Sequence, residues 1–175
     1  KDMNDWDKYW SKKTDTINIF YDKIALFYRK HIIRSILNFF LERNYRENSV
    51  LLHAGCGNGD VDEKANKRFK LLSLDNSISA LKINNSSSML VQGDIFQLPI
   101  KIASIDGIYN LGLMEHFTEN EIIEILKEFG RVIRRDGKIT IFWPPEFGLS
   151  VVFLKTVHFV ANKVFRKGIK LHPDE

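Results

Sequence analysis

The chain has 175 residues, with 26 Lys and Arg against 22 Asp and Glu, 44% hydrophobic residues and one cysteine. This length and composition predict one soluble globular domain, or one domain with an added segment, and exclude whole-chain disorder. A single cysteine excludes an internal disulfide framework and multi-cysteine metal sites. The charged, aromatic N-terminus does not resemble a secretory signal, and no run of about 18 uncharged apolar residues predicts a membrane span. We therefore expect a cytoplasmic protein.

Charge divides the chain into three parts. The net charge is +3 over residues 1–49, −2 over 50–148 and +3 over 149–175. A nucleic-acid-binding module would concentrate its basic residues on the folded core, so the acidic middle argues against one. The basic flanks remain open to anionic partners.

The N-terminal part reads as helical. Residues 1–16 are polar with three aromatics and predict an irregular or short helical lead-in. From residue 17 to 43 apolar side chains recur at helical spacing and predict one long amphipathic helix or two shorter ones. The residues that define this apolar face are Ile24, Phe27, Ile32, Ile36, Phe39 and Phe40.

Five short apolar runs follow, and they alternate with helical or polar connections. One connection, Glu119–Ile133, predicts an amphipathic helix with Thr118 as its N-cap. This alternation predicts an α/β fold, a doubly wound, mostly parallel sheet with helices on both faces. Ligands of such sheets bind beyond the carboxyl ends of the strands. The runs are Val50–His53, Leu71–Leu74, Met89–Val91, Ile105–Tyr109 and Lys138–Trp143.

The first run enters a loop that contains Gly55, Gly57 and Gly59. Glycines at this density allow a tight turn and let a ligand approach the main chain, although a plain tight turn would also use them. The spacing matches neither the nucleoside-triphosphate loop nor the G-x-G-x-x-G dinucleotide form. Cys56 within this loop is either a thiol activated near a helix N-terminus or a small residue that fits. His53, Cys56 and His116 lack the spacing of metal ligands, so we expect no metal.

Polar residues also end the later runs. Asp75 can accept hydrogen bonds from both hydroxyls of a ribose, or it can cap the helix that follows. Asp94 can meet the amine of an adenine with Ile95 against the ring, or it can serve the turn alone. The fourth run ends in NLGLMEH, a loop that suits the floor of a pocket. There His116 is either a general base or a structural hydrogen-bonding residue.

Taken together, these motifs resemble the class I S-adenosylmethionine-dependent methyltransferases, in particular the small-molecule branch often called methyltransferase type 11. The resemblance runs from about Val50 to Pro145 and lies in five segments in the family's order: VLLHAGCGNGD, LLSLDNS, GDIFQLP, IDGIYNLGLMEHF and LKEFGRVIRRDGKITIFWPP. It implies a Rossmann-like fold and an enzyme that transfers a methyl group from S-adenosylmethionine to a small-molecule or lipid-like acceptor, leaving S-adenosylhomocysteine.

The resemblance also implies residue roles. Residues 1–49 would form a helical cover over the core at 50–148, with Tyr9, Trp10, Tyr21 and Tyr28 as candidates because aromatic faces suit a sulfonium cation. Glu115 or His116 would be the base if the acceptor loses a proton. The residues that would bind the cofactor are His53, Gly55, Cys56, Gly57, Gly59, Asp75, Asn76, Asp94, Ile95, Asn110 and Leu111.

The sequence departs from the family in three places. His53 stands where the family usually has an acidic residue, and Asp75 and Asp94 are closer together than usual, which predicts a short second helix. Only 32 residues follow Trp143, and they read as helical. We therefore expect the last two strands of the family's sheet to be missing, and Lys1 in place of Met suggests a trimmed chain.

The C-terminal segment, residues 149–175, is apolar and basic. Phe153, Val157, Val160, Ala161 and Val164 fall on one helical face. The segment could pack on the core, cover the substrate, or lie on a membrane through residues 149–170. Two functions outside the main hypothesis stay open: a nucleotide-cofactor oxidoreductase on a similar sheet, and a non-catalytic remnant that binds the cofactor or a partner. No nucleic-acid partner is expected.

Overall fold

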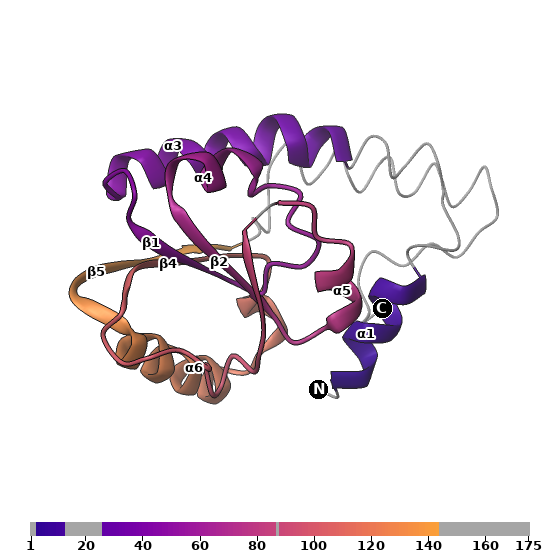
Figure 1. Cartoon of the computed structure of the whole chain (residues 1–175). Coiled ribbons are helices and arrows are strands. Elements are labelled where there is room, and N and C mark those ends of the chain that lie inside the picture. The colour runs from indigo at the N-terminus through magenta and orange to yellow at the C-terminus, as the bar shows by residue number, and fades with distance from the viewer. Residues whose placement is uncertain (1–2, 13–25, 87, 144–175) are drawn as a thin grey trace.

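The computed structural model describes residues 3–12, 26–86 and 88–143. It places a sheet between helices that cover both of its faces (Figure 1). The predicted Tyr21 candidate, the C-terminal segment and the question of further strands after the fifth lie outside the described residues. Within the described residues no helix has the length and apolar character needed to cross a membrane.

The sheet has five parallel strands in the order β3-β2-β1-β4-β5. The chain moves outward from β1 to β3 and then returns to the other side of β1, so the switch point lies between β1 and β4. The predicted α/β fold class is therefore confirmed. The strands are β1 Val50–Ala54, β2 Lys70–Asp75, β3 Met89–Gln92, β4 Ile105–Leu111 and β5 Ile133–Phe142.

The last strand begins earlier than the sequence predicts. Residues 134–137, which lie between the predicted helix and the predicted fifth run, lie inside β5, which pairs with β4 from Ile105↔Ile133 to Leu111↔Phe142. The pairing passes directly from Ile105↔Ile133 to Gly107↔Lys138, so residues 134–137 have no partners in β4. They form a bulge in the strand, as the Arg-Asp-Gly sequence favours.

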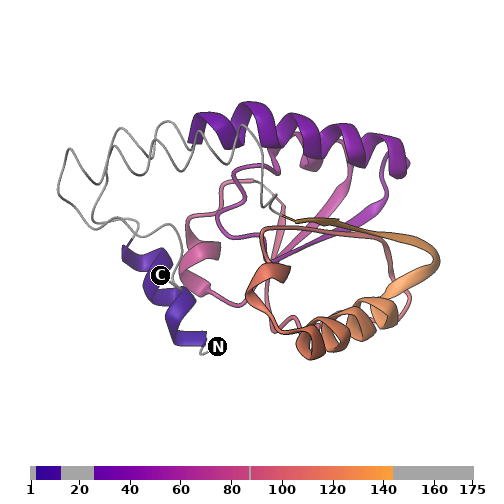
Figure 2. The ribbon, with the colours of Figure 1, turned by 180° about the vertical axis from the view of Figure 1, so that it is seen from behind.

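Helices pack on the two faces of the sheet (Figures 1 and 2). Helices α3 (Arg34–Asn44) and α4 (Glu63–Arg68) share one face, and α6 (Glu119–Val132) covers the other. The short α5 (Ile78–Lys82) contacts β2 and β3, and α1 (Met3–Lys12) packs on α5. A π-helical turn, η1 (Arg29–Ile33), precedes α3, and a 3-10 turn, η2 (Met114–His116), follows β4.

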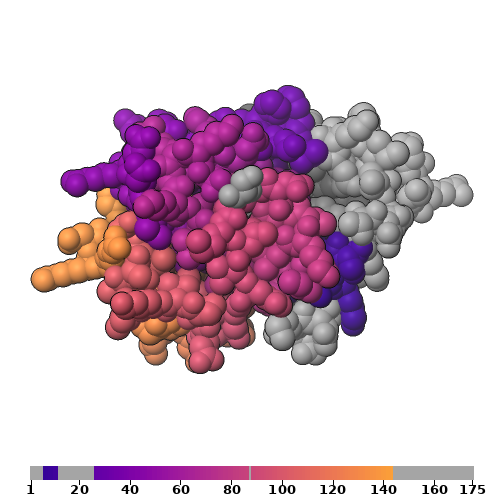
Figure 3. All heavy atoms as spheres, in the orientation of Figure 1, coloured from indigo at the N-terminus to yellow at the C-terminus, as the bar shows by residue number. Residues whose placement is uncertain are grey.

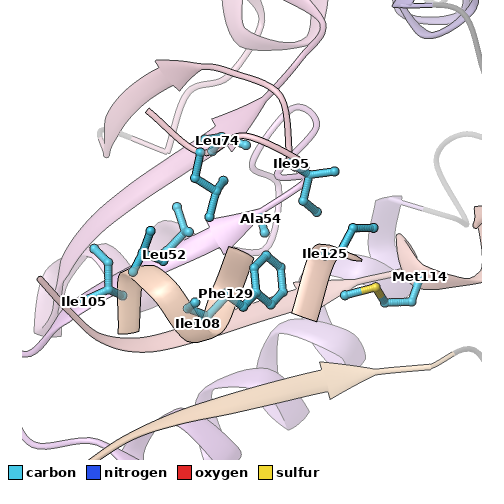
Figure 4. Packing of buried hydrophobic residues seen from close by; sticks show 11 residues of the cluster. Leu52, Ala54, Leu74, Ile95, Ile105, Ile108, Met114, Ile125 and Phe129 are labelled. Atoms are coloured by element: carbon cyan, nitrogen blue, oxygen red, sulfur yellow. The ribbon is translucent and has the colours of Figure 1, made fainter. Parts of the chain in front are cut away.

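On the α6 face the predicted amphipathic helix supplies much of the core, although Leu126, which was predicted on its apolar face, is 37% exposed. Ile125, Phe129 and Val132 of α6 are fully buried in one cluster with Leu52 and Ile108 of the central strands. Figure 4 shows Ile125 and Phe129 beside these strands. The helix begins at a capping box in which Thr118 accepts from the backbone of Glu121, so the predicted N-cap is confirmed. These contacts fix the loop between β4 and α6 at the carboxyl end of the sheet.

On the opposite face the predicted apolar surface of the first long helix is wrong. Leu37, Asn38 and Leu41 of α3 are buried, whereas the predicted residues Phe27, Ile32, Ile36, Phe39 and Phe40 are exposed. The π-helical turn η1 adds a residue to one turn and rotates the helix before α3 begins. Ile36, Phe39 and Phe40 lie within the regular helix α3 after this turn, so the turn does not account for their exposure. Helix α3 has apolar side chains on two sides, and spacing alone does not say which side packs on the sheet.

Candidate functional site

The three glycines after β1 all adopt left-handed backbone angles. Their φ values are +71° for Gly55, +52° for Gly57 and +66° for Gly59, a region that other residues rarely occupy. The loop is tied to β2, because Gly55 and Cys56 donate to the carbonyl of Leu74 at 2.8 and 2.9 Å. Three left-handed residues and two hydrogen bonds to β2 therefore hold this loop at the carboxyl ends of β1 and β2.

Asp75 at the end of β2 receives two backbone donors. Gly57 N–H donates to Oδ2 at 2.8 Å, and Ser77 N–H donates to Oδ1 at 2.9 Å. Burial raises the pKa of this carboxyl, although both N–H groups act in the opposite direction. The N-cap of α5 is Ser77, whose Oγ accepts from Ala80 N–H. Each Asp75 oxygen therefore keeps a free lone pair that can accept a further donor.

A cleft of about 250 Å³ lies beside β2 and β3 and is lined by Asn76, Gln92, Gly93 and Asp94. Asp94 Oδ1 accepts from Phe96 N–H at 2.9 Å, which is the turn role expected of an Asp here, and the rest of the carboxyl is exposed. Ile95 is buried in the core on the α6 face. The structure therefore brings Asn76 and Asp94 together at this cleft, while Ile95 supports it from the core.

The loop after β4 lies next to the glycine loop. A Cβ at Gly55 would be 2.8 Å from the side chain of Leu113, so the two loops touch. Asn110, at the end of β4, is 1% exposed, and neither atom of its side-chain amide has a partner. Leu111 instead packs toward the cluster on the α3 face. Of these two predicted residues, Asn110 is the one with unused hydrogen-bonding capacity.

The predicted base candidates lie in the turn η2. The side chain of His116 is 8% exposed, and its Nε2 is 4.0 Å from Oε1 of Glu115. The ring of His116 also contacts the ring of Trp6 edge-on, with centroids 5.0 Å apart. The Oε2 atom of Glu115 is buried and has no partner. His116 therefore lies between a carboxylate and an aromatic wall.

Helix α1 contacts both the glycine loop and the start of α5. Asp7 accepts from Ser77 Oγ at 2.5 Å and from Ser79 N–H at 3.0 Å, and these hydrogen bonds lower its pKa. Trp10 is buried against Gly57, where a Cβ would be 2.7 Å from its ring. In the space-filling view α1 (indigo) abuts the magenta segment that carries α5 (Figure 3). The described part of α1 therefore lies over the carboxyl ends of the strands.

Sequence reasoning named Tyr9 and Trp10 in this helix but missed Trp6 and Asp7. Tyr9 packs edge-on against both tryptophans, with centroids 6.0 Å from Trp6 and 5.4 Å from Trp10. The i, i+4 spacing of Trp6 and Trp10 places them on one helical face and could have indicated the contact. Tyr28 lies in a different helical turn, just before η1.

Buried polar atoms without a partner gather at these strand ends. Among the described residues, six such side-chain atoms occur, and all but Arg34 Nε follow β1 or β4 or lie at their ends. Each unsatisfied buried group costs about 1–3 kcal/mol, so native proteins usually pair such groups with protein, water or a ligand. The atoms are His53 Nε2, Asn58 Oδ1, Asn110 Nδ2 and Oδ1, and Glu115 Oε2. This concentration makes the carboxyl ends of β1 and β4 the candidate site of the described residues.

Cys56 is a buried residue of the glycine loop. Cys56 is buried, and burial raises the pKa of its thiol far above the ordinary value, so the thiolate needed for reactivity is suppressed. Of the two readings of Cys56, the structure favours the small residue that fits. No group of three or more candidate metal ligands occurs in the part of the chain that the structure describes.

Comparison with known proteins gives one family. The sequence model of the family described as "Methyltransferase domain" matches residues 52–141, just over half of the chain. A protein of Encephalitozoon cuniculi named as a methyltransferase is 28% identical over 109 residues, 59% of this chain and 49% of that protein. The chain thus spans about half the length of this curated relative.

Solved structures share the fold. A structure from Methanococcus maripaludis, described as an S-adenosyl-L-methionine-dependent methyltransferase, is 22% identical to this chain and has a TM-score of 0.63. The match covers 85% of this chain and 75% of that one. Phosphoethanolamine N-methyltransferase 1 of Haemonchus contortus, solved with phosphoethanolamine and S-adenosylhomocysteine, is 21% identical. Its TM-score is 0.64, and the match covers 79% of this chain and 31% of that one.

Proposed function

We propose a function from the premise that the chain belongs to the methyltransferase domain family. The family match confirms the predicted methyltransferase family, and solved structures with the same fold include S-adenosylmethionine-dependent methyltransferases. For the protein itself we propose methyl transfer from S-adenosylmethionine to a small-molecule acceptor that offers an N–H or O–H group. The observation that carries this proposal is the concentration of unpartnered buried polar atoms beside the glycine loop.

The residues present fit the cofactor. The Asp75 side chain can accept from both ribose hydroxyls, and Asp94 and Asn76 at the neighbouring cleft suit the amine and ring of an adenine. The glycine loop admits the methionine part close to the main chain, next to His53 and Trp10. The match to the methyltransferase domain family disfavours the oxidoreductase alternative.

The methyl acceptor would lie near the carboxyl end of β4. When bound, S-adenosylmethionine supplies a methyl group on a positively charged sulfur, so the protein must chiefly align the acceptor. Asn110 and Glu115 offer acceptor atoms to an N–H or O–H group, and the Trp6 ring supplies an apolar wall. His116, with Glu115 beside it, can take the proton that the acceptor loses. A lipid-like acceptor remains an alternative if residues 149–175 extend this wall.

Isothermal calorimetry tests the cofactor part of the proposal. We expect S-adenosylmethionine and S-adenosylhomocysteine to bind and NAD not to bind. Asp75→Ala should weaken binding at least about ten-fold, since it removes hydrogen bonds to a charged group. Asp136→Ala is the matched control, because Asp136 is an exposed carboxylate in β5. Binding of NAD alone, or equal loss in both variants, would contradict the proposal.

Turnover tests catalysis and the base. Release of S-adenosylhomocysteine should depend on an added amine or alcohol acceptor, and a purified chain that binds the cofactor but never turns over would be the non-catalytic remnant. His116→Asn should lower kcat with little change in cofactor affinity if His116 is the base. Unchanged kcat in this variant would remove the base role and leave His116 as a structural residue.

We also propose peripheral membrane contact through residues 149–170, a basic apolar segment outside the described residues. Flotation with anionic vesicles tests it, and the absence of binding would reject it. A cytoplasmic location, with or without such membrane contact, stays a prediction from the sequence.

A further inference from the structure

Helix α3 and the turn η1 carry an apolar surface on the side that faces away from the sheet. In Figures 1 and 2 this helix lies on the outside of the molecule, with the sheet on its inner side. Its spacing of i, i+4, i+7 and i+8 places four large apolar side chains on one helical face. We call them the outer α3 face: Ile32 (44% exposed), Ile36 (44%), Phe39 (53%) and Phe40 (43%).

Basic side chains accompany the outer α3 face. The guanidinium carbon of Arg43 lies 4.7 Å from the centroid of the Phe39 ring, and Lys30 in η1 is exposed. The acidic side chain of Glu42 is paired, with its Oε1 3.4 Å from Nζ of Lys64 in α4. The surface is therefore both apolar and positively charged. Together η1 and α3 hold Arg29, Lys30, Arg34 and Arg43 against the single acidic residue Glu42.

This combination of groups fits an anionic lipid surface. Apolar side chains of a surface helix enter the boundary between headgroups and acyl chains, while Lys and Arg attract anionic lipids. A two-fold interface with a second copy would bring the same basic side chains together, and the flank 149–175 also has a net charge of +3. Like charges thus oppose both of these partners. A nucleic acid is bound mainly through its phosphates, so it would leave Ile32 and Ile36 unused.

We propose that the outer α3 face lies on an anionic membrane surface, with its apolar side chains in the interface and Lys30 and Arg43 against lipid headgroups. The inference goes beyond methyl transfer, and it depends neither on the cofactor site nor on residues 149–170. It gives a role to the five apolar residues of the N-terminal helical segment that the sequence assigns to the core and the structure exposes. These residues are Phe27, Ile32, Ile36, Phe39 and Phe40.

Flotation of the full chain tests the apolar part of this contact. The probes are vesicles of phosphatidylcholine alone and vesicles that also contain phosphatidylserine, and we expect binding to the second kind only. Ile36→Gln with Phe39→Gln should lower the partition coefficient at least about ten-fold, because two apolar side chains lose their burial in lipid. Ile102→Gln with Ile123→Gln is the matched control, since these side chains are 62% and 51% exposed and lie outside η1 and α3. The control should bind as the unmodified chain does.

A second pair of variants tests the charges. Lys30→Gln with Arg43→Gln should weaken binding to the anionic vesicles by about five-fold for each charge removed, and raised salt should weaken it further. Lys101→Gln with Lys127→Gln removes the same net charge from exposed positions outside η1 and α3, and it should have a much smaller effect. Equal losses in the two charge variants would show that only the overall charge matters and would overturn the inference.

The remaining outcomes separate this surface from other contacts. If the Ile36 and Phe39 variant binds vesicles as its control does, the inference is overturned and residues 149–170 stay the candidate contact. If the unmodified chain does not bind, both membrane proposals fail, whereas the calorimetric test of the cofactor is unaffected. A dimer that the variant loses in analytical ultracentrifugation, without vesicle binding, would assign the surface to a second copy. Far-UV circular dichroism checks folding, and if the apolar variant does not fold, the charge variants decide.

Discussion

The contact between Trp10 and Gly57 gives a sharp test of how α1 covers the strand ends. In Gly57→Ala the new Cβ would be 2.7 Å from the Trp10 ring, well inside ordinary van der Waals contact. The residue also keeps a φ of +52°, which costs Ala about 1–2 kcal/mol. Overpacking against a buried ring typically adds about 1–3 kcal/mol. We expect Gly57→Ala to lower the free energy of unfolding by about 2–5 kcal/mol in total.

A double-mutant cycle isolates the steric part. Trp10→Ala removes the ring but leaves the backbone cost at residue 57, so the double variant should be more stable than the sum of the single changes predicts. The interaction term should be at least about 1 kcal/mol, since residues in direct contact couple by about 0.5–3 kcal/mol. Urea denaturation of the four proteins, followed by far-UV circular dichroism, measures all the terms.

Gly130→Ala is the matched control for this cycle. Gly130 lies exposed in α6, and a Cβ there meets nothing within 4 Å. Replacing a helical glycine by alanine should stabilise the protein by about 0.5–1 kcal/mol. Additive effects of Gly57→Ala and Trp10→Ala within about 0.5 kcal/mol would show that α1 does not rest on the glycine loop, and would refute the reasoning.

Three further outcomes follow from the geometry of single residues. Burial raises the pKa of Asp75 above its ordinary value of 3.8, and protonation removes a lone pair that would accept a ribose hydroxyl. We therefore expect the affinity for S-adenosylhomocysteine to fall as the pH drops through this raised pKa. Calorimetry between pH 4 and 8 measures the affinity, and a flat profile would contradict the expectation. Thr118→Ala should cost about 1 kcal/mol of stability in urea, because the capping box of α6 is lost; a change below about 0.3 kcal/mol would contradict this. Burial raises the pKa of Cys56, so at pH 8 the native thiol should react with a disulfide reagent more than about ten-fold more slowly than the unfolded protein does. Equal rates would show that the thiol is accessible.

The sequence by itself determined the strands and the motifs at their ends. Short apolar runs alternate with polar connections, and this pattern depends only on local burial, so all five strands were predictable. The tight glycine turn at Gly55 and Gly57 and the carboxylate of Asp75 at a strand end were also predictable, because both are local requirements of the sequence. The start of β5 was misplaced, because Ile133 pairs with β4 ahead of the unpaired bulge at residues 134–137.

Only the tertiary structure decided which distant residues meet. The partner of His53 is Asp62, nine residues away across the glycine loop, and the sequence gives no spacing rule for such a pair. The contacts of α1 with Gly57 and with His116 likewise join residues far apart in the chain. Helix α3 has apolar side chains on two sides, and its packing on the sheet decided which side is buried. Side-chain contacts of this kind arise when separate elements pack, whereas periodicity reports only which positions share a face.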